Sequence, residues 1–130
     1  MKVLALDYGA ARTGVAVSDA TGTIARPLDV VERAATPEGL ARIGQIVLEQ
    51  AAERVVVGLP LTLRGERGSQ VDVTEEFVQA LREAIAVPVE TYDERFTTAL
   101  AARDQGEAPE DARAAAYLLE SYLEWAAGAR

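Results

Sequence analysis

Acidic residues at three points of this 130-residue chain have the spacing and setting to do chemistry. Asp7 ends an apolar run, Asp93 and Glu94 end a later one, and Asp111 lies near the start of the last helical pattern. Carboxylate oxygens suit Mg²⁺ or Mn²⁺, and two such ions about 3.5–4 Å apart can activate water and stabilise the leaving oxygen of a phosphodiester. This chemistry needs neither histidine nor cysteine, and the chain contains neither.

Each acid also has a purely structural interpretation. Asp7 could begin an Asx-type turn, and Asp111 could simply complement the dipole of a helix N-terminus. Asp93 and Glu94 are adjacent, so on an extended strand they point to opposite faces of the sheet. Periodicity does not decide which of these two reaches a site.

Basic and hydroxyl side chains near the acids could contact a phosphate backbone. Arginines occur in the turn after Asp7 and in the glycine-containing segment 61–70, where the structural alternative is an exposed loop charge. A threonine after Asp93 could instead cap a short helix. The candidate nucleic-acid contacts are Arg12, Arg64, Arg67, Arg95, Thr97 and Thr98.

The net charge of −8 argues against a broad surface for binding polyanions. Residues 1–65 contain seven acidic and seven basic side chains, whereas residues 66–130 contain fourteen and six. A bound nucleic acid should therefore favour arginines of the first half and the central loop. Divalent cations at clustered acids would reduce the repulsion that a phosphate meets.

Length and composition predict a single domain spanning residues 1–130, with 49% hydrophobic residues to form its core. No run of about twenty apolar residues is present, and the first residues reach an acid too soon for a signal peptide. We therefore expect a soluble, cytoplasmic protein without a membrane partner.

The first half of the chain predicts an antiparallel meander followed by a helix and a buried strand. The strands are expected at Val3–Asp7, Gly14–Asp19 and Thr23–Val31. A helix should start at Thr36 and Pro37 and end near Glu53, burying Leu40, Ile43, Val47 and Ala51. The β-branched run Arg54–Pro60 is typical of a central strand, parallel to the first.

The second half predicts alternating helices and strands after an exposed, mobile loop at 61–70. The expected elements are a helix burying Val73, Phe77, Leu81 and Ala84, a strand at Val87–Tyr92, a short helix through Ala102, and a last helix burying Ala112, Ala115, Ala116, Leu119, Tyr122 and Leu123. The order βββαβαβαα predicts an α/β fold, a five-stranded mixed sheet with helices on both faces. If the first, fourth and fifth strands are parallel neighbours, their acidic ends share one edge.

The chain resembles the YqgF/RuvX-type family in four ordered segments: LALDYGAARTGVAVSD, VVVGLPLTLRGERG, TYDERFTT and EDARAAAYLLESYL. That family is described as Holliday junction resolvases and pre-16S rRNA processing nucleases with an RNase H-like fold. The resemblance implies that Asp7, Glu94 and Asp111 form an acidic triad that binds divalent metal. It thereby selects Glu94 over Asp93, which the residue pattern left open.

The resemblance and the residues together predict a nuclease dependent on Mg²⁺ or Mn²⁺, with two ions at the site. Its expected substrate is structured nucleic acid, either branched DNA of the Holliday junction kind or the 5′ end of pre-16S rRNA. The alternative is a non-catalytic nucleic-acid-binding or ribosome-assembly factor on the same fold. Both a monomer and a homodimer are compatible with the sequence.

Overall fold

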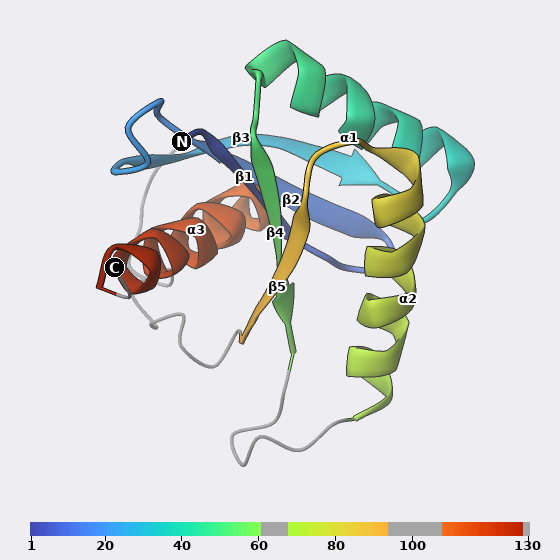
Figure 1. Ribbon diagram of the computed structural model, residues 1–130. Coiled ribbons are helices and arrows are strands. Elements are labelled where there is room, and N and C mark those ends of the chain that lie inside the picture. The colour runs from blue at the N-terminus through green and yellow to red at the C-terminus, as the bar shows by residue number, and fades with distance from the viewer. Residues whose placement is uncertain (61–67, 94–107, 129–130) are drawn as a thin grey trace.

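The computed structural model describes residues 1–60, 68–93 and 108–128. In these segments the chain forms a five-stranded sheet flanked by helices (Figure 1). The elements are β1 (Val3–Asp7), β2 (Arg12–Ser18), β3 (Ala25–Glu32), α1 (Pro37–Gln50), β4 (Arg54–Leu59), α2 (Ser69–Ala84), β5 (Val89–Asp93) and α3 (Glu110–Gly128).

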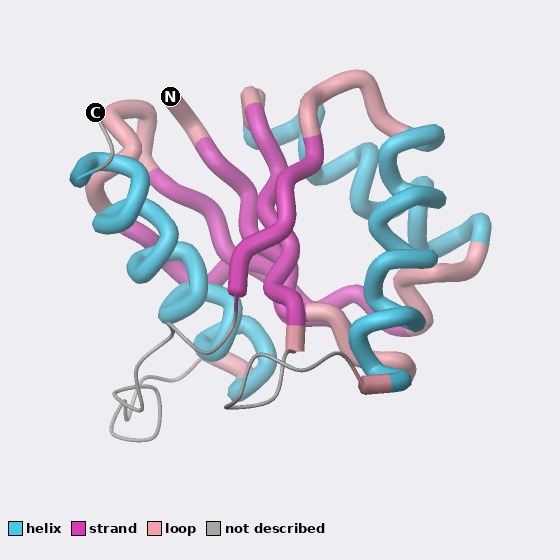
Figure 2. Tube along the Cα trace, turned by 60° about the horizontal axis from the view of Figure 1, so that its bottom comes forward, coloured by secondary structure: helices cyan, strands magenta, loops and turns pink. Residues whose placement is uncertain are grey.

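The sheet is mixed, with the strand order β3-β2-β1-β4-β5. β2 runs antiparallel to both β1 and β3, whereas β4 runs parallel to both β1 and β5. Helices α1 and α2 cover one face of the sheet and α3 covers the other (Figures 1 and 2). The predicted architecture, including the parallel neighbours β1, β4 and β5, is confirmed.

Local sequence explains both ends of α1. The Thr36 hydroxyl accepts a hydrogen bond from the Gly39 amide at 3.1 Å, and Pro37 occupies the first helical position, as predicted. The helix ends at Gln50 rather than near Glu53, because Ala51 adopts a left-handed conformation with φ 54°. The prediction that Ala51 is buried was therefore wrong.

The predicted buried face of α2 needs a correction. Val73 is 42% exposed and Ala84 is also exposed, whereas Phe77 and Leu81 are buried as predicted. The full buried set of the helix is Val71, Thr74, Phe77, Val78 and Leu81. The stripe is centred on Thr74, whose hydroxyl donates to the Gln70 carbonyl at 2.8 Å. Apolar periodicity does not include this threonine, because its side chain is polar. The predicted buried face is therefore rotated about the helix axis relative to the observed one.

Several strand ends also differ from the predicted ones. β2 begins at Arg12 instead of Gly14, because pairing with β3 extends to Arg12 opposite Glu32. β5 begins at Val89, since the preceding Pro88 has no N–H for the ladder. β3 is shifted to Ala25–Glu32 and β4 ends at Leu59. The expected short helix through Ala102 lies outside the described residues.

Alternation along the strands divides the core into two layers. In β1, Leu4 and Leu6 pack toward α1 and α2, whereas Val3 and Ala5 pack toward α3. All six residues predicted to form the buried stripe of the last helix are buried in α3, together with Leu118. Within the described ranges, no helix combines the length and apolarity that crossing a membrane requires.

A polar network holds the C-terminal half of α3 against β4 and β5. Arg54 Nη1 lies 2.7 Å from Glu90 Oε1 and donates to the Tyr122 hydroxyl at 3.0 Å, and this hydroxyl donates to Glu90 at 2.9 Å. Burial raises the pKa of Tyr122, so the hydroxyl remains a donor. Glu90 is thus a structural partner of α3. The network thus ties the helix that carries Asp111 to β4 and β5.

Candidate active site

The acidic ends of the parallel strands share one edge of the sheet, as the sequence predicted. Asp7 is the last residue of β1, and Asp93, the last residue of β5, pairs with Leu59 at the end of β4. In open α/β sheets, ligands bind beyond the carboxyl ends of the strands. A ligand-binding site is therefore expected at this edge of the sheet.

Side-chain alternation separates the two aspartates. Asp7 has the parity of Val3 and Ala5, which pack toward α3. Asp93 follows Tyr92, which also packs toward α3, so its side chain belongs to the opposite face. Asp93 is thus directed away from the face on which Asp7 lies.

Gly14 brings the start of α3 onto the sheet beside Asp7. Gly14 is the β2 partner of Asp7, and a Cβ atom built on it would lie 1.8 Å from the backbone oxygen of Asp111. Paired Cα atoms of antiparallel strands are about 4.5–5.5 Å apart. The backbones of Asp7 and Asp111, far apart in the sequence, therefore meet at one corner of the fold.

Gly14 is a site-shaping residue that the sequence reasoning missed. A glycine inside a strand often marks the close approach of another backbone, and this signal was available in the sequence. The partner in that approach could not be read from the sequence, since it lies in the last helix.

Arg12 lies at the same corner and forms an ion pair with Asp111. Its Nε atom lies 3.1 Å from Oδ2 of Asp111, and the two side chains are 66% and 35% exposed. Arg12 has the β2 parity of Gly14, so both residues belong to the α3 face. The predicted phosphate contact of Arg12 thus has a competing partner within the protein.

The turn between β1 and β2 is anchored on the side away from α3. The Tyr8 ring stacks on Phe77 of α2 with centroids 4.3 Å apart. Gly9 fits a tight turn, because a Cβ there would lie 2.5 Å from the Arg12 oxygen, and the Thr13 hydroxyl lies 3.4 Å from both the amide nitrogen and the carbonyl oxygen of Gly9. These contacts pack the turn that joins Asp7 to Arg12 against α2 and Thr13.

The chemistry of this corner fits a hard divalent cation. Asp7 and Asp111 supply carboxylate oxygens, which Mg²⁺ and Mn²⁺ prefer, and the glycine lets the two backbones approach. Among the residues that the structure describes, no group of three or more acids is arranged to hold a metal. Glu94, the third predicted ligand, lies outside them. So do five predicted nucleic-acid contacts: Arg64, Arg67, Arg95, Thr97 and Thr98.

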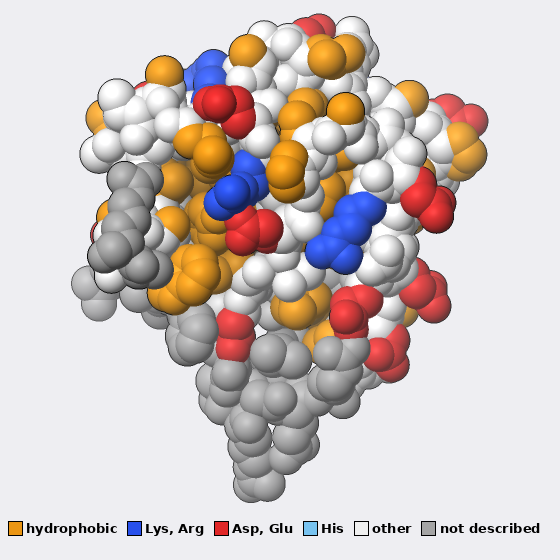
Figure 3. Space-filling model, in the orientation of Figure 1, with side chains coloured by type: hydrophobic (Ala, Val, Ile, Leu, Met, Phe, Trp, Pro, Cys, Tyr) orange, Lys and Arg blue, Asp and Glu red, His pale blue; other side chains and the backbone are white. Residues whose placement is uncertain are grey.

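The distribution of charged side chains on one face of the molecule is consistent with the net negative charge of the sequence. On the face drawn in Figure 3, acidic, basic and apolar side chains are interspersed, without a broad basic patch over the described part of the molecule. Contacts with a polyanion on this face would therefore be local rather than spread over a wide surface.

Relatives with curated names match nearly the full chain. A protein of Chloroflexus aurantiacus named "Putative pre-16S rRNA nuclease" is 43% identical over 94% of this chain and 86% of its own length. A protein of the same name from Desulforudis audaxviator is 42% identical, over 95% of this chain and 94% of its own length.

Solved structures are similar in fold. Thermus thermophilus RuvC in complex with a Holliday junction substrate matches with a TM-score of 0.57 and 20% identity, covering 96% of both chains. The Fowlpox virus resolvase in complex with Holliday junction DNA matches with a TM-score of 0.56 and 12% identity, covering 97% of this chain and 99% of that one. These similarities confirm the predicted RNase H-like fold.

The family model described as "RuvX: Holliday junction resolvase" matches residues 1–125. This match and the identity to the curated relatives agree over nearly the whole chain. The chain therefore belongs to the RuvX family of nucleases.

Proposed function

We propose that this protein is a divalent-metal-dependent nuclease that hydrolyses phosphodiester bonds in structured nucleic acid. The observation that carries the proposal is the convergence of Asp7 and Asp111, which Gly14 permits, beside the edge where the parallel strands end. Membership of a nuclease family supports the reaction class.

Asp7, Glu94 and Asp111 are the proposed metal ligands and catalytic residues. Asp7 and Asp111 both supply carboxylate oxygens, and the support for their pairing is the approach of their backbones through Gly14. Glu94 is supported by the family resemblance and by the direction of Asp93, which belongs to the other face of the sheet. When bound, two Mg²⁺ or Mn²⁺ ions would activate water for attack on phosphorus and stabilise the leaving oxygen.

The other proposed site residues position the substrate. Arg12 lies at the corner of the two aspartates, where its guanidinium can contact a phosphate next to the scissile bond. The proposed contacts from residues outside the described ranges are Arg64, Arg67, Arg95, Thr97 and Thr98. Such contacts to the backbone would make nucleic-acid shape, rather than base sequence, the basis of recognition.

The proposed substrates are a pre-16S rRNA end and branched DNA. The names of the curated relatives favour the rRNA precursor, and the family description favours the junction. Both substrates would present a structured phosphate backbone to the same acidic corner, and a panel of cleavage substrates distinguishes them.

The test is a cleavage panel with Mg²⁺ or Mn²⁺, comparing rRNA precursor, four-way junction and linear duplex. We expect cleavage of a structured substrate over the duplex, complete loss with EDTA, and restoration by excess Mn²⁺. The Asp111→Asn variant should cleave at least tenfold more slowly, because loss of even an outer-shell metal partner costs about 10–100-fold. Binding without metal-dependent cleavage of any substrate would contradict the proposal and support the non-catalytic alternative.

A further inference from the structure

The ion pair between Arg12 and Asp111 occupies one of the two carboxylate oxygens of a proposed metal ligand. Arg12 Nε lies 3.1 Å from Asp111 Oδ2, and both side chains reach solvent. Asp7 lies at the same corner, through its pairing with Gly14. We propose that Arg12 is an internal counter-cation that competes with the divalent ion for Asp111, an inference that rests on the proposed function.

Electrostatics explain why a cation belongs there before metal binds. Two carboxylates brought to one corner repel each other, and a nearby guanidinium offsets part of that repulsion. An ion bound to Asp111 would neutralise the same charge and would repel the guanidinium. Arg12 and the metal are therefore alternative partners of one carboxylate.

Displacement of Arg12 by metal is feasible because the pair is exposed. The Arg12 side chain is 66% exposed, and exposed ion pairs are weak. Once released, the guanidinium remains attached to β2 beside the site, where a substrate phosphate can replace Asp111 as its anionic partner. Metal loading would thus free Arg12 for the nucleic acid.

The proposal predicts that removing Arg12 has opposite effects on the two ligands. Arg12→Gln should bind Mn²⁺ more tightly by about two- to fivefold in the absence of nucleic acid, a factor set by the small strength of an exposed ion pair. The same variant should bind nucleic acid more weakly, because a phosphate contact is lost. A residue that merely orients Asp111 would give the opposite change in metal affinity.

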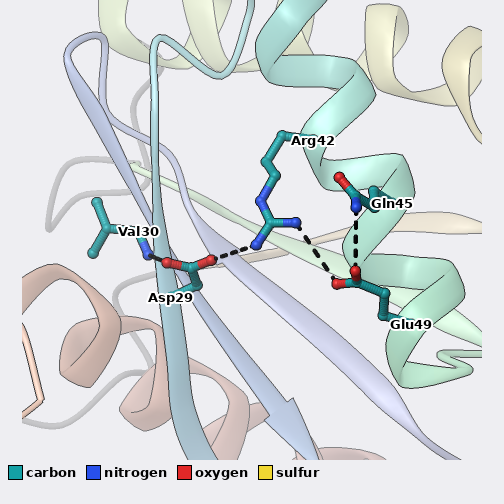
Figure 4. A network of polar contacts seen from close by, with 5 residues as sticks. All are labelled: Asp29, Val30, Arg42, Gln45 and Glu49. Carbon is teal, nitrogen blue, oxygen red and sulfur yellow. Dashed lines mark hydrogen bonds and ion pairs between the residues drawn. The ribbon is translucent and has the colours of Figure 1, made fainter.

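Titration calorimetry of Mn²⁺ at low ionic strength tests the proposal on the full chain, with free Mn²⁺ measured by electron paramagnetic resonance as a second readout. Arg12→Lys keeps the charge, and we expect its affinity to lie between those of the wild type and Arg12→Gln. The matched control is Arg42→Gln. Arg42 lies on the opposite side of the sheet and contacts Asp29 at 3.0 Å and Glu49 at 3.6 Å (Figure 4). This control removes the same charge and should leave the Mn²⁺ affinity unchanged.

The outcomes separate the inference from the function on which it rests. Tighter Mn²⁺ binding by Arg12→Gln, and not by Arg42→Gln, would support the competition. Equal or weaker binding by Arg12→Gln, with a wild type that binds Mn²⁺, would overturn the competition and leave the nuclease proposal standing. A wild type without a Mn²⁺ site would overturn both.

Discussion

Asp7→Asn is expected to lower metal-dependent cleavage by more than a hundredfold. Asp7 ends β1 at the corner where β2 and α3 meet, so its carboxylate is the proposed central ligand. Loss of an outer-shell partner of a metal costs about 10–100-fold, and loss of a direct ligand should cost more. Asparagine has nearly the same shape, so the fold should remain. Cleavage rates and urea unfolding of both proteins check this expectation.

Asp93 offers a matched control at the same edge of the sheet. It ends β5 as Asp7 ends β1, but alternation directs its side chain to the other face. Asp93→Asn should therefore keep most of the cleavage activity, whereas Glu94→Gln should behave like Asp7→Asn. Equal cleavage by wild type and Asp7→Asn would refute the assignment of the site.

Gly14→Ala is expected to damage both stability and activity. The added Cβ would lie 1.8 Å from the Asp111 oxygen and 2.3 Å from its carbonyl carbon, so the backbone of α3 or β2 must shift. Overpacking of this kind typically costs about 1–3 kcal/mol of unfolding free energy. Because the shift moves Asp111 relative to Asp7, Mn²⁺ affinity should fall as well. Urea unfolding and Mn²⁺ titration measure the two effects.

Gly44→Ala is the control for the loss of a glycine. Gly44 lies inside α1, and a Cβ there would meet Ile85 Cγ2 at 3.6 Å, an ordinary contact. This substitution should raise stability by about 0.5–1 kcal/mol, because glycine is unfavourable within a helix. It should leave cleavage unchanged. A Gly14→Ala protein as stable and as active as the wild type would contradict the close packing of α3 on β2.

Local sequence patterns were sufficient to predict the sheet and the edge that carries Asp7. The β-branched run in β4 and the helix-start signal at Thr36 are set by residues adjacent in the sequence. The structure confirms both predictions. The parallel pairing of β1, β4 and β5 then follows from the order of the elements. Where a polar residue entered the core, as Thr74 does in α2, the hydrophobic pattern placed the buried face only in part: Phe77 and Leu81 are buried, whereas Val73 is exposed.

Contacts between distant segments account for what the sequence did not predict about the site. The approach of Gly14 to Asp111 and the ion pair of Arg12 both depend on how α3 docks across β2. No periodicity within either segment encodes that docking. Alternation along β5 directs Asp93 away from the face on which Asp7 lies, whereas the preference for Glu94 comes from the family resemblance.

Anomalous diffraction from crystals grown with Mn²⁺ would show whether Asp7 and Asp111 hold a divalent ion. We expect an anomalous peak between the two carboxylates, with Mn–O distances of about 2.0–2.2 Å, as is typical of small divalent ions, and Glu94 as a further ligand. In that crystal, Arg12 should have moved away from Asp111. Crystals with Mn²⁺ bound elsewhere, and with the pair of Arg12 and Asp111 intact at this corner, would overturn the proposed metal site.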